Sequence, residues 1–216
     1  MGDPSVRDGV AWLLRKRLTL AIVGVLVAVY AAEQLVRATA GPHTWLYLFF
    51  ARPDPTPGWV LAPFAHLGPV HLLSSVLVVL VYGAMVEDLL TPRAYLALYL
   101  LAGYVAVVGQ VAFYHVAGVS GGTIGASGAG LALVGFVAVT AALGKVPAAS
   151  PMAPAASALA WLGLGVVVAV LVSDFTPLFT LATGTARFGH LGGALAGGLS
   201  ALWIRGPPPE PTAPET

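Results

Sequence analysis

The chain has 216 residues, of which 58% are hydrophobic and only 9% are charged, and its formal net charge is +1. Ordinary soluble domains are about 25% charged, so this composition excludes a water-soluble fold with a polar shell and predicts lipid as the main solvent. The near-neutral charge gives no sign of nucleic-acid binding. Because the chain has no cysteine, disulfides, thiolate metal sites and a cysteine nucleophile are excluded as well.

Apolar runs long enough to cross a bilayer dominate the sequence. A membrane-spanning helix needs about 20 mostly apolar residues, and a short cytosolic lead-in at residues 1–18 is followed by six such runs. We therefore expect an all-α, six-helix membrane domain over residues 19–205 and a disordered, proline-rich tail over 206–216. The expected spans are Thr19–Val36, Val70–Val86, Tyr95–Ala117, Ser127–Leu143, Ala155–Ser173 and Ala186–Ile204.

The basic residues indicate how these spans are oriented. Cytosolic loops of membrane proteins are enriched in Lys and Arg, and four basic residues precede the first span. With the N-terminus in the cytosol, alternation of the spans places seven of the ten basic residues inside. The sequence thus predicts a multi-pass protein of the cell membrane, with both termini inside. The seven residues are Arg7, Arg15, Lys16, Arg17, Arg93, Lys145 and Arg205.

Residues 37–69 form the longest connection, which this topology puts outside. The segment is rich in aromatic residues, and four prolines between positions 53 and 63 exclude a continuous helix through it. We expect it to lie in the membrane interface, either as a plain anchor or with a part in substrate access. The first span can alternatively be a cleaved signal peptide, because Ala38-Thr39-Ala40 resembles a cleavage site, but charged residues interrupt it and its apolar run is long.

Three polar side chains from different spans fall at one depth. An α-helix rises about 1.5 Å per residue, which places Ser127 about 27 Å, His71 about 24 Å and His190 about 22 Å from the cytosolic ends of their spans. Since the hydrocarbon core is about 30 Å thick, all three should lie a little below the outer surface. Polar groups at that depth are costly unless they meet partners or water, so we expect them to converge.

A serine and a histidine in one layer predict hydrolytic chemistry. His190 can take the proton from the Ser127 hydroxyl, which then attacks a peptide carbonyl. Ser127 opens its helix, so unpaired backbone N–H groups and the positive end of the helix dipole lie beside it and can stabilise an oxyanion. His71 can add a further donor. The alternative is that the serine and the histidine only pack or bridge helices, as isolated ones commonly do.

Small residues on the fourth and sixth spans can bring the pair together. His190, Gly193 and Gly197 share one helix face, and Gly128 begins a comparable small face on the fourth span. Small residues let helix backbones approach closely in lipid. If the two faces meet, Ser127 and His190 come within hydrogen-bond reach. A glycine seam without catalysis would pack in the same way.

These motifs resemble those of the rhomboid intramembrane serine proteases. The resemblance covers about residues 69–203 and rests on Gly125-Ala126-Ser127-Gly128 together with the His-x-x-Gly-x-x-x-Gly pattern that runs from His190 to Gly197. His71-Leu72-Leu73-Ser74-Ser75 is similar to the family's His-x-x-x-Asn pattern, with Ser75 in place of the asparagine. Glu87 matches a family glutamate at the inner end of the second span, where we interpret it as a structural helix-end contact.

The resemblance implies a function as well as a fold. It implies that Ser127 and His190 form a catalytic dyad without a third carboxylate, and that neither a metal nor another cofactor takes part. It also implies that the substrates are transmembrane proteins, cleaved near the outer face. The residues expected to support the oxyanion are His71, Ser75, Gly125 and Gly128.

Two other functions stay open from the sequence. A non-catalytic relative that binds and escorts membrane clients would typically lack the serine or the histidine; both are present, but Ser75 in place of asparagine keeps this alternative alive. A small transporter or channel would place polar groups at the bilayer midplane or show an inverted repeat. Neither feature is visible in the sequence.

Overall fold

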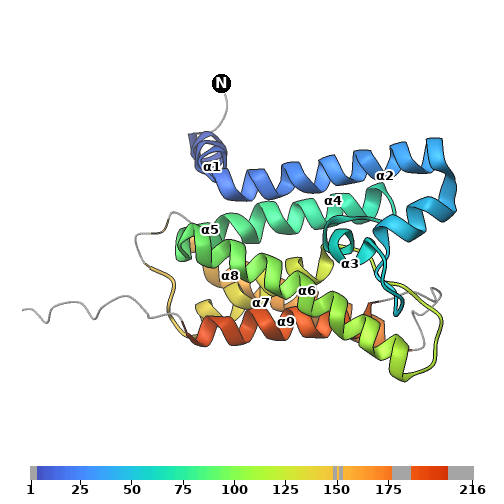
Figure 1. Cartoon of the computed structure of the whole chain (residues 1–216). Coiled ribbons are helices and arrows are strands. Elements are labelled where there is room, and N and C mark those ends of the chain that lie inside the picture. The colour runs from blue at the N-terminus through green and yellow to red at the C-terminus, as the bar shows by residue number, and fades with distance from the viewer. Residues whose placement is uncertain (1–3, 148–149, 151–152, 177–185, 204–216) are drawn as a thin grey trace, which may run out of the picture.

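The computed structural model describes residues 4–147, 150, 153–176 and 186–203. Over these residues the chain is helical and forms no β-strand apart from a bridge between Ala51 and Thr123 (Figure 1). The expected tail at 206–216 lies outside the described residues. In chain order the elements are α1 (Pro4–Leu14), α2 (Arg17–Phe49), α3 (Gly58–Leu61), η1 (Ala62–Phe64), α4 (Pro69–Val78), η2 (Val79–Gly83), α5 (Ala84–Leu89), α6 (Pro92–Val116), α7 (Ser127–Ala142), α8 (Ala153–Phe175) and α9 (Arg187–Leu202).

A helix coincides with each of the six ranges that the sequence predicts as spans. Among the described residues, four helices are long and apolar enough to cross a membrane: α2, the continuous helix Pro69–Leu89, α6 and α8. The other two, α7 and α9, have 16 residues each. An all-helical integral membrane protein is thereby confirmed, whereas the count of six spans and their orientation stay predictions.

The predicted end of the first span is wrong, because α2 continues past Val36 to Phe49. Gly41 interrupts the helix with a φ of 81°, a left-handed conformation that favours glycine, and Pro42 begins the next turn. The helix resumes because its apolar side chains find partners in the segments before α4 and α7. These partners form a small cluster composed of Trp45, Phe49, Ala65 and Ile124.

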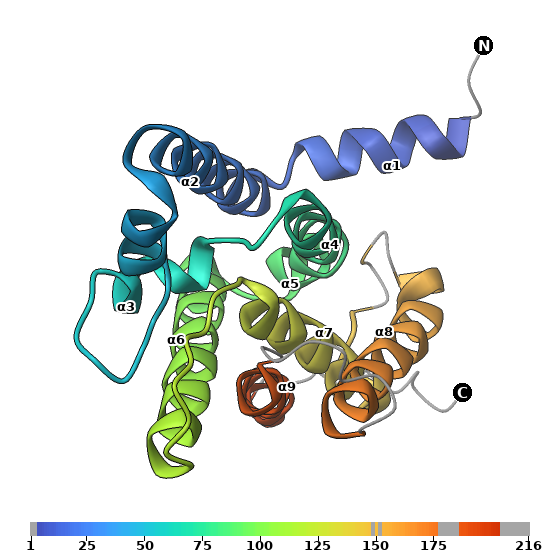
Figure 2. The same ribbon diagram turned by 90° about the vertical axis from the view of Figure 1, so that its right-hand side faces the viewer.

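Helix α7 lies at the centre of the bundle. Seen end-on in Figure 2, it is surrounded by α4, α6, α8 and α9, while α2 packs on the outer side of α4 and α1 points away from the bundle. Most residues of α7 are buried, and no polar side chain interrupts the run from Gly128 to Val139. A helix that is apolar on every side belongs in the interior, which explains its central place.

Glycines bring α9 against α7 with almost no space between the backbones. A Cβ atom at Gly193 would collide with the carbonyl oxygen of Gly128, and one at Gly197 would collide with that of Ala132. Such close approach is how small residues associate helices in lipid, where the hydrophobic effect gives no driving force between them. The predicted small faces on the two helices therefore meet, and we call this contact the glycine seam.

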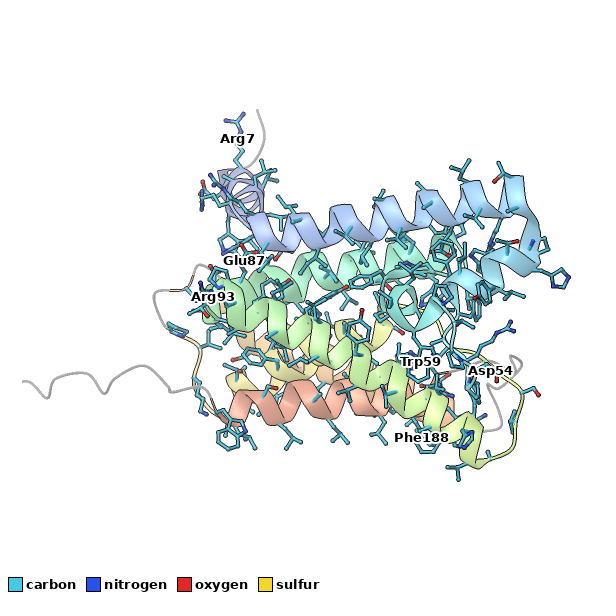
Figure 3. All side chains as sticks on the ribbon, in the orientation of Figure 1. Arg7, Asp54, Trp59, Glu87, Arg93 and Phe188 are labelled. Carbon is cyan, nitrogen blue, oxygen red and sulfur yellow. The ribbon has the colours of Figure 1, made fainter. Side chains whose placement is uncertain are left out.

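Labelled side chains distinguish the two ends of the bundle. Figure 3 shows Arg7, Glu87 and Arg93 at one end, and Asp54 and Phe188 at the opposite end. We call them the Glu87 end and the Phe188 end. The four charged residues labelled there thus lie at the ends of the bundle, where a membrane protein meets water.

Glu87 fastens the start of α2 at its own end of the bundle. Its carboxylate accepts hydrogen bonds from the backbone N–H groups of Leu18 (3.2 Å) and Thr19 (2.8 Å), and from the Thr19 hydroxyl (2.7 Å). Its negative charge also meets the positive end of the α2 dipole. The neighbouring Asp88 pairs with Lys16. These contacts accord with a structural helix-end role for Glu87.

Glu33 joins α2 to the segment that leads into α4. It is fully buried, and its carboxylate accepts hydrogen bonds from the Trp45 indole (3.0 Å) and from the backbone N–H of His66 (2.7 Å). These donors replace the hydrogen bonds to water that the carboxylate loses when it is buried. The His66 ring is also fully buried, with its centroid 5.1 Å from that of His71. Glu33 thus holds the chain just ahead of a predicted site residue.

We expect Gly197→Ala to lower the thermal unfolding midpoint of the purified protein in detergent. The added methyl group must push apart two backbones, and overpacking of this kind costs about 1–3 kcal/mol. Gly165→Ala is the matched control, because a Cβ atom at Gly165 meets nothing within 4 Å. An equal effect of the two substitutions on the midpoint would show that the glycine seam does not limit stability.

We expect acid to destabilise the protein through His66. Burial and, to a smaller extent, the nearby His71 ring lower the pKa of His66 to about 4, whereas an unfolded histidine binds its proton below about pH 6.5. The unfolded state therefore gains stability relative to the folded state as the pH falls from 6.5 to 4, by about 3 kcal/mol. His66→Gln should lose less stability than the unmodified protein over this interval in thermal unfolding. The exposed His115→Gln should behave as the unmodified protein does, and an acid response unchanged by His66→Gln would contradict this account.

Candidate active site

The loop before α7 sets the position of Ser127. Thr123 and Ala51 exchange two backbone hydrogen bonds of 3.0 and 2.9 Å, and the N–H of Gly125 donates to the carbonyl of Ala62 (2.8 Å). Gly125 has a φ of 134°, which a residue with a side chain rarely adopts. These contacts tie the loop to the α2–α4 connection, so Ser127 enters α7 as its first residue from a fixed direction.

The start of α9 is held by a side chain that the sequence analysis did not single out. Gln110 on α6 is buried, and its Oε1 accepts hydrogen bonds from the backbone N–H groups of Phe188 (3.0 Å) and Gly189 (3.4 Å). The first N–H groups of a helix have no partner within it, so Gln110 acts as a cap supplied by another helix. The available signal was a lone amide in an otherwise apolar span.

Ser127 and His190 meet at the top of the glycine seam. The Oγ of Ser127 lies 2.9 Å from Nε2 of His190, and both residues are partly buried. The expected hydrogen-bond reach between the two side chains is therefore present. Gly128 makes the approach possible, since a Cβ atom there would collide with Ala106 of α6 and would also touch the carbonyl of Gly189.

A carboxylate occupies the other side of the His190 ring. Asp174, near the end of α8, places Oδ2 at 2.6 Å from Nδ1 of His190, and its residue exposure is only 4%. The pair that was expected to act without a third carboxylate therefore has one beside it in this structure. The predicted fifth span ends at Ser173, one residue before Asp174.

His71 approaches the serine from α4. Its Nδ1 accepts a hydrogen bond from the backbone N–H of Leu67 (3.4 Å), which leaves the proton of a neutral ring on Nε2. A Cβ atom at Gly125 would lie 3.0 Å from His71 Nε2 and 3.4 Å from Ser127 Oγ, so one methyl group would touch both side chains. Ser75 is buried one turn further along α4.

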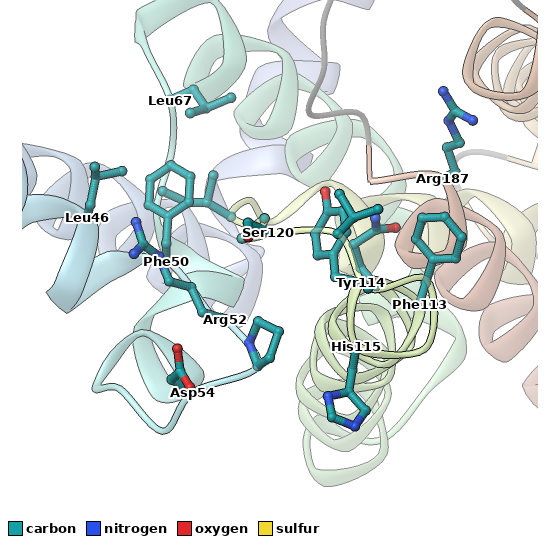
Figure 4. Close-up of a pocket in the computed structure, with 17 residues that line it drawn as sticks. Leu46, Phe50, Arg52, Asp54, Leu67, Phe113, Tyr114, His115, Ser120 and Arg187 are labelled. Atoms are coloured by element: carbon teal, nitrogen blue, oxygen red, sulfur yellow. The ribbon is translucent and has the colours of Figure 1, made fainter.

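A cavity of about 1030 Å³ opens at the Phe188 end of the bundle. Figure 4 shows it between the end of α2, the end of α6 and the start of α9, with Phe50, Tyr114 and Arg187 among the side chains around it. Ser127 and His190 do not line it, but Gln110, which caps α9, does. The site thus lies beside an opening at the end of the bundle that the topology predicts to face outward.

The arrangement can carry out acid–base and nucleophilic chemistry with protein groups. A hydroxyl is hydrogen-bonded to an imidazole, the imidazole to a carboxylate, and a second imidazole lies next to the hydroxyl. Within the described ranges, no three His, Asp or Glu side chains gather as a set of metal ligands. The contacts above join Ser127, His190, Asp174 and His71 into one site.

Comparison with known proteins supports one family. No curated protein matches the chain. A family model described as the Rhomboid domain matches residues 56–207, which contain α3 to α9 and all the site residues described above. The match covers well over half of the chain and agrees with the resemblance of its motifs. The chain therefore belongs to the rhomboid family.

Proposed function

We propose that this protein is an intramembrane serine endopeptidase that cleaves transmembrane proteins near the outer membrane face. The single observation that carries the proposal is the 2.9 Å distance between Ser127 Oγ and His190 Nε2. A nucleophile and its base at hydrogen-bond distance are the minimum for this chemistry. Membership of the rhomboid family, which contains intramembrane proteases and inactive relatives, supports the same reading.

The proposed reaction begins with proton transfer from Ser127 to His190. As the proton moves to Nε2, Oγ forms a bond to the carbonyl carbon of the scissile peptide, and the carbonyl π electrons move onto oxygen. His190 then returns the proton to the leaving amine as the C–N bond breaks. Water hydrolyses the resulting ester by the same sequence, with His190 again as base, which restores the Ser127 hydroxyl.

The developing oxyanion has donors on two sides. The first backbone N–H groups of α7 point out of the helix at Ser127, where the helix dipole is positive. His71 can offer its Nε2–H, since Nδ1 is already engaged by Leu67. Preorganised donors of this kind stabilise an oxyanion without having to reorient. The carbonyl oxygen would then lie between α7 and α4.

The proposed membrane arrangement has six spans with both termini in the cytosol. The Glu87 end, with α1 and Arg93, would face inward, and the basic Lys145 also reaches the last turn of α9 there through bonds to the carbonyls of Ala201 and Leu202. The positive-inside rule favours this orientation. It places the site and the adjoining cavity toward the outside, where water needed for hydrolysis can enter.

We expect the Ser127→Ala substitution to abolish labelling of the purified protein by a fluorophosphonate probe, because Oγ is the atom that attacks phosphorus. His190→Ala should slow labelling by about 10²–10⁴-fold, the usual contribution of a general base. Gel fluorescence after timed incubation in detergent measures both. Ser74→Ala is the control, since that hydroxyl is exposed and bonds within its own helix. Labelling that survives in Ser127→Ala would remove the protease proposal and favour a non-catalytic protein that binds membrane clients.

We expect Ser75→Asn to raise the labelling rate without loss of stability. A longer side chain with an amide donor can reach the oxyanion from α4, and one such donor is worth up to about 10²–10³ in rate. The rate constant for probe labelling and the thermal midpoint are the two measurements. Ser74→Asn, on the exposed side of the same helix, controls for the added bulk. An unchanged or lower rate in Ser75→Asn would mean that this position does not support the oxyanion.

A further inference from the structure

Asp174 is aimed at the site by the packing of α8. The buried residues of this helix recur along one face, and Asp174 is the last of them. The hydroxyl of Tyr82 donates to the carbonyl of Leu159 (2.9 Å), and Gly163 sits against Tyr82 and Val134. The inner face of α8 is therefore fixed against the bundle along its length, and Asp174 continues that face to the His190 ring.

The two nitrogens of the His190 ring make hydrogen bonds of opposite kinds, one as donor and one as acceptor. An ionised carboxylate only accepts hydrogen bonds, so contact with Asp174 Oδ2 at 2.6 Å assigns the proton of a neutral ring to Nδ1. The other nitrogen, Nε2, then has a free lone pair directed at the Ser127 hydroxyl 2.9 Å away. A general base needs this tautomer, because an imidazole protonated on Nε2 cannot accept the proton of serine.

We propose that Asp174 is a positioning residue that holds His190 in the Nδ1–H tautomer and stabilises the imidazolium formed during acylation. This inference rests on the protease function proposed above and extends the pair to three residues on three helices. The proton taken from Ser127 stays on Nε2 until it passes to the leaving amine, and Asp174 remains ionised throughout. A purely structural ion pair would join α8 to α9 equally well but would not depend on the tautomer.

Burial favours the positioning role. A carboxylate near the end of an apolar helix is costly without a partner, and the His190 ring supplies one. The titratable groups that face this ring from other helices are His71 of α4 and Asp174 of α8, while Arg187 lies one turn earlier on α9 itself. A change at Asp174 therefore alters the charge facing the ring from α8 while the other groups stay in place.

The first test measures the rate of fluorophosphonate labelling against pH. Asp174→Asn keeps the shape but can donate to Nδ1, which forces the proton onto Nε2, so labelling at neutral pH should fall by about 10³–10⁴-fold. The rate should recover as the pH rises and hydroxide replaces the base. Asp174→Glu should restore part of the neutral rate because it restores the acceptor. Asp8→Asn, an exposed carboxylate on α1 at the opposite end, should change nothing.

The second test reads the tautomer without requiring activity. The protein has five histidines, and ¹⁵N-histidine labelling with His190→Gln as the assignment control identifies the His190 ring by NMR. We expect a protonated Nδ1 and an unprotonated Nε2 in the unmodified protein, and the reverse in Asp174→Asn. This measurement on the unmodified protein decides the tautomer even where a variant does not fold.

The outcomes separate the two proposals. If the unmodified protein is not labelled at Ser127, the protease function is overturned. Its ¹⁵N spectrum still tests the hydrogen bond between Asp174 and His190. A neutral-pH labelling rate in Asp174→Asn within about twofold of the unmodified protein, with the same pH profile, overturns the positioning role. A proton on Nε2 of His190 in the unmodified protein overturns it as well.

Discussion

The close approach of α7 and α9 is the constraint on which the site depends. Two glycines of α9 leave room for the carbonyls of Gly128 and Ala132, so the helices meet backbone to backbone. At this separation the side chains at the top of the seam are held close to each other. Ser127, the first residue of α7, and His190, in the first turn of α9, therefore meet as a result of packing. Side chains of ordinary size along the seam would move the helices apart and lengthen this contact.

The remaining helices orient what the seam brings together. Gln110 of α6 holds the first N–H groups of α9, Asp174 of α8 contacts the back of the His190 ring, and His71 of α4 approaches from the side of the serine. Each of these polar side chains lies in an apolar helix, where it would be unfavourable without a partner. Gln110 and Asp174 are almost completely buried, so water competes little for their hydrogen bonds and they hold their geometry well. Catalytic competence, as proposed, therefore depends on α4, α6 and α8 as well as on the glycine seam.

The sequence predicted the parts of this arrangement that have a local pattern. The six apolar ranges, the small faces from Gly128 and Gly193, and the common depth of Ser127 and His190 all follow from helix geometry and bilayer thickness. The roles of Asp174 and Gln110 were not predicted, because each contacts a residue on another helix. A lone acid at a helix end also resembles a loop residue. The extension of α2 beyond Gly41 was not predicted for a related reason. It depends on contacts of Trp45 and Phe49 with segments much later in the chain, which periodicity does not report.

The low dielectric of the membrane explains why the polar side chains of the site lie in contact with one another. A single serine, histidine or aspartate facing lipid would be penalised separately, whereas each becomes tolerable when it satisfies the next. Once Ser127 and His190 have met, the free nitrogen of the imidazole is itself a buried polar group, and a carboxylate at Asp174 satisfies it. Because Asp174 is only 4% exposed, little solvent is available to replace its carboxylate at Nδ1.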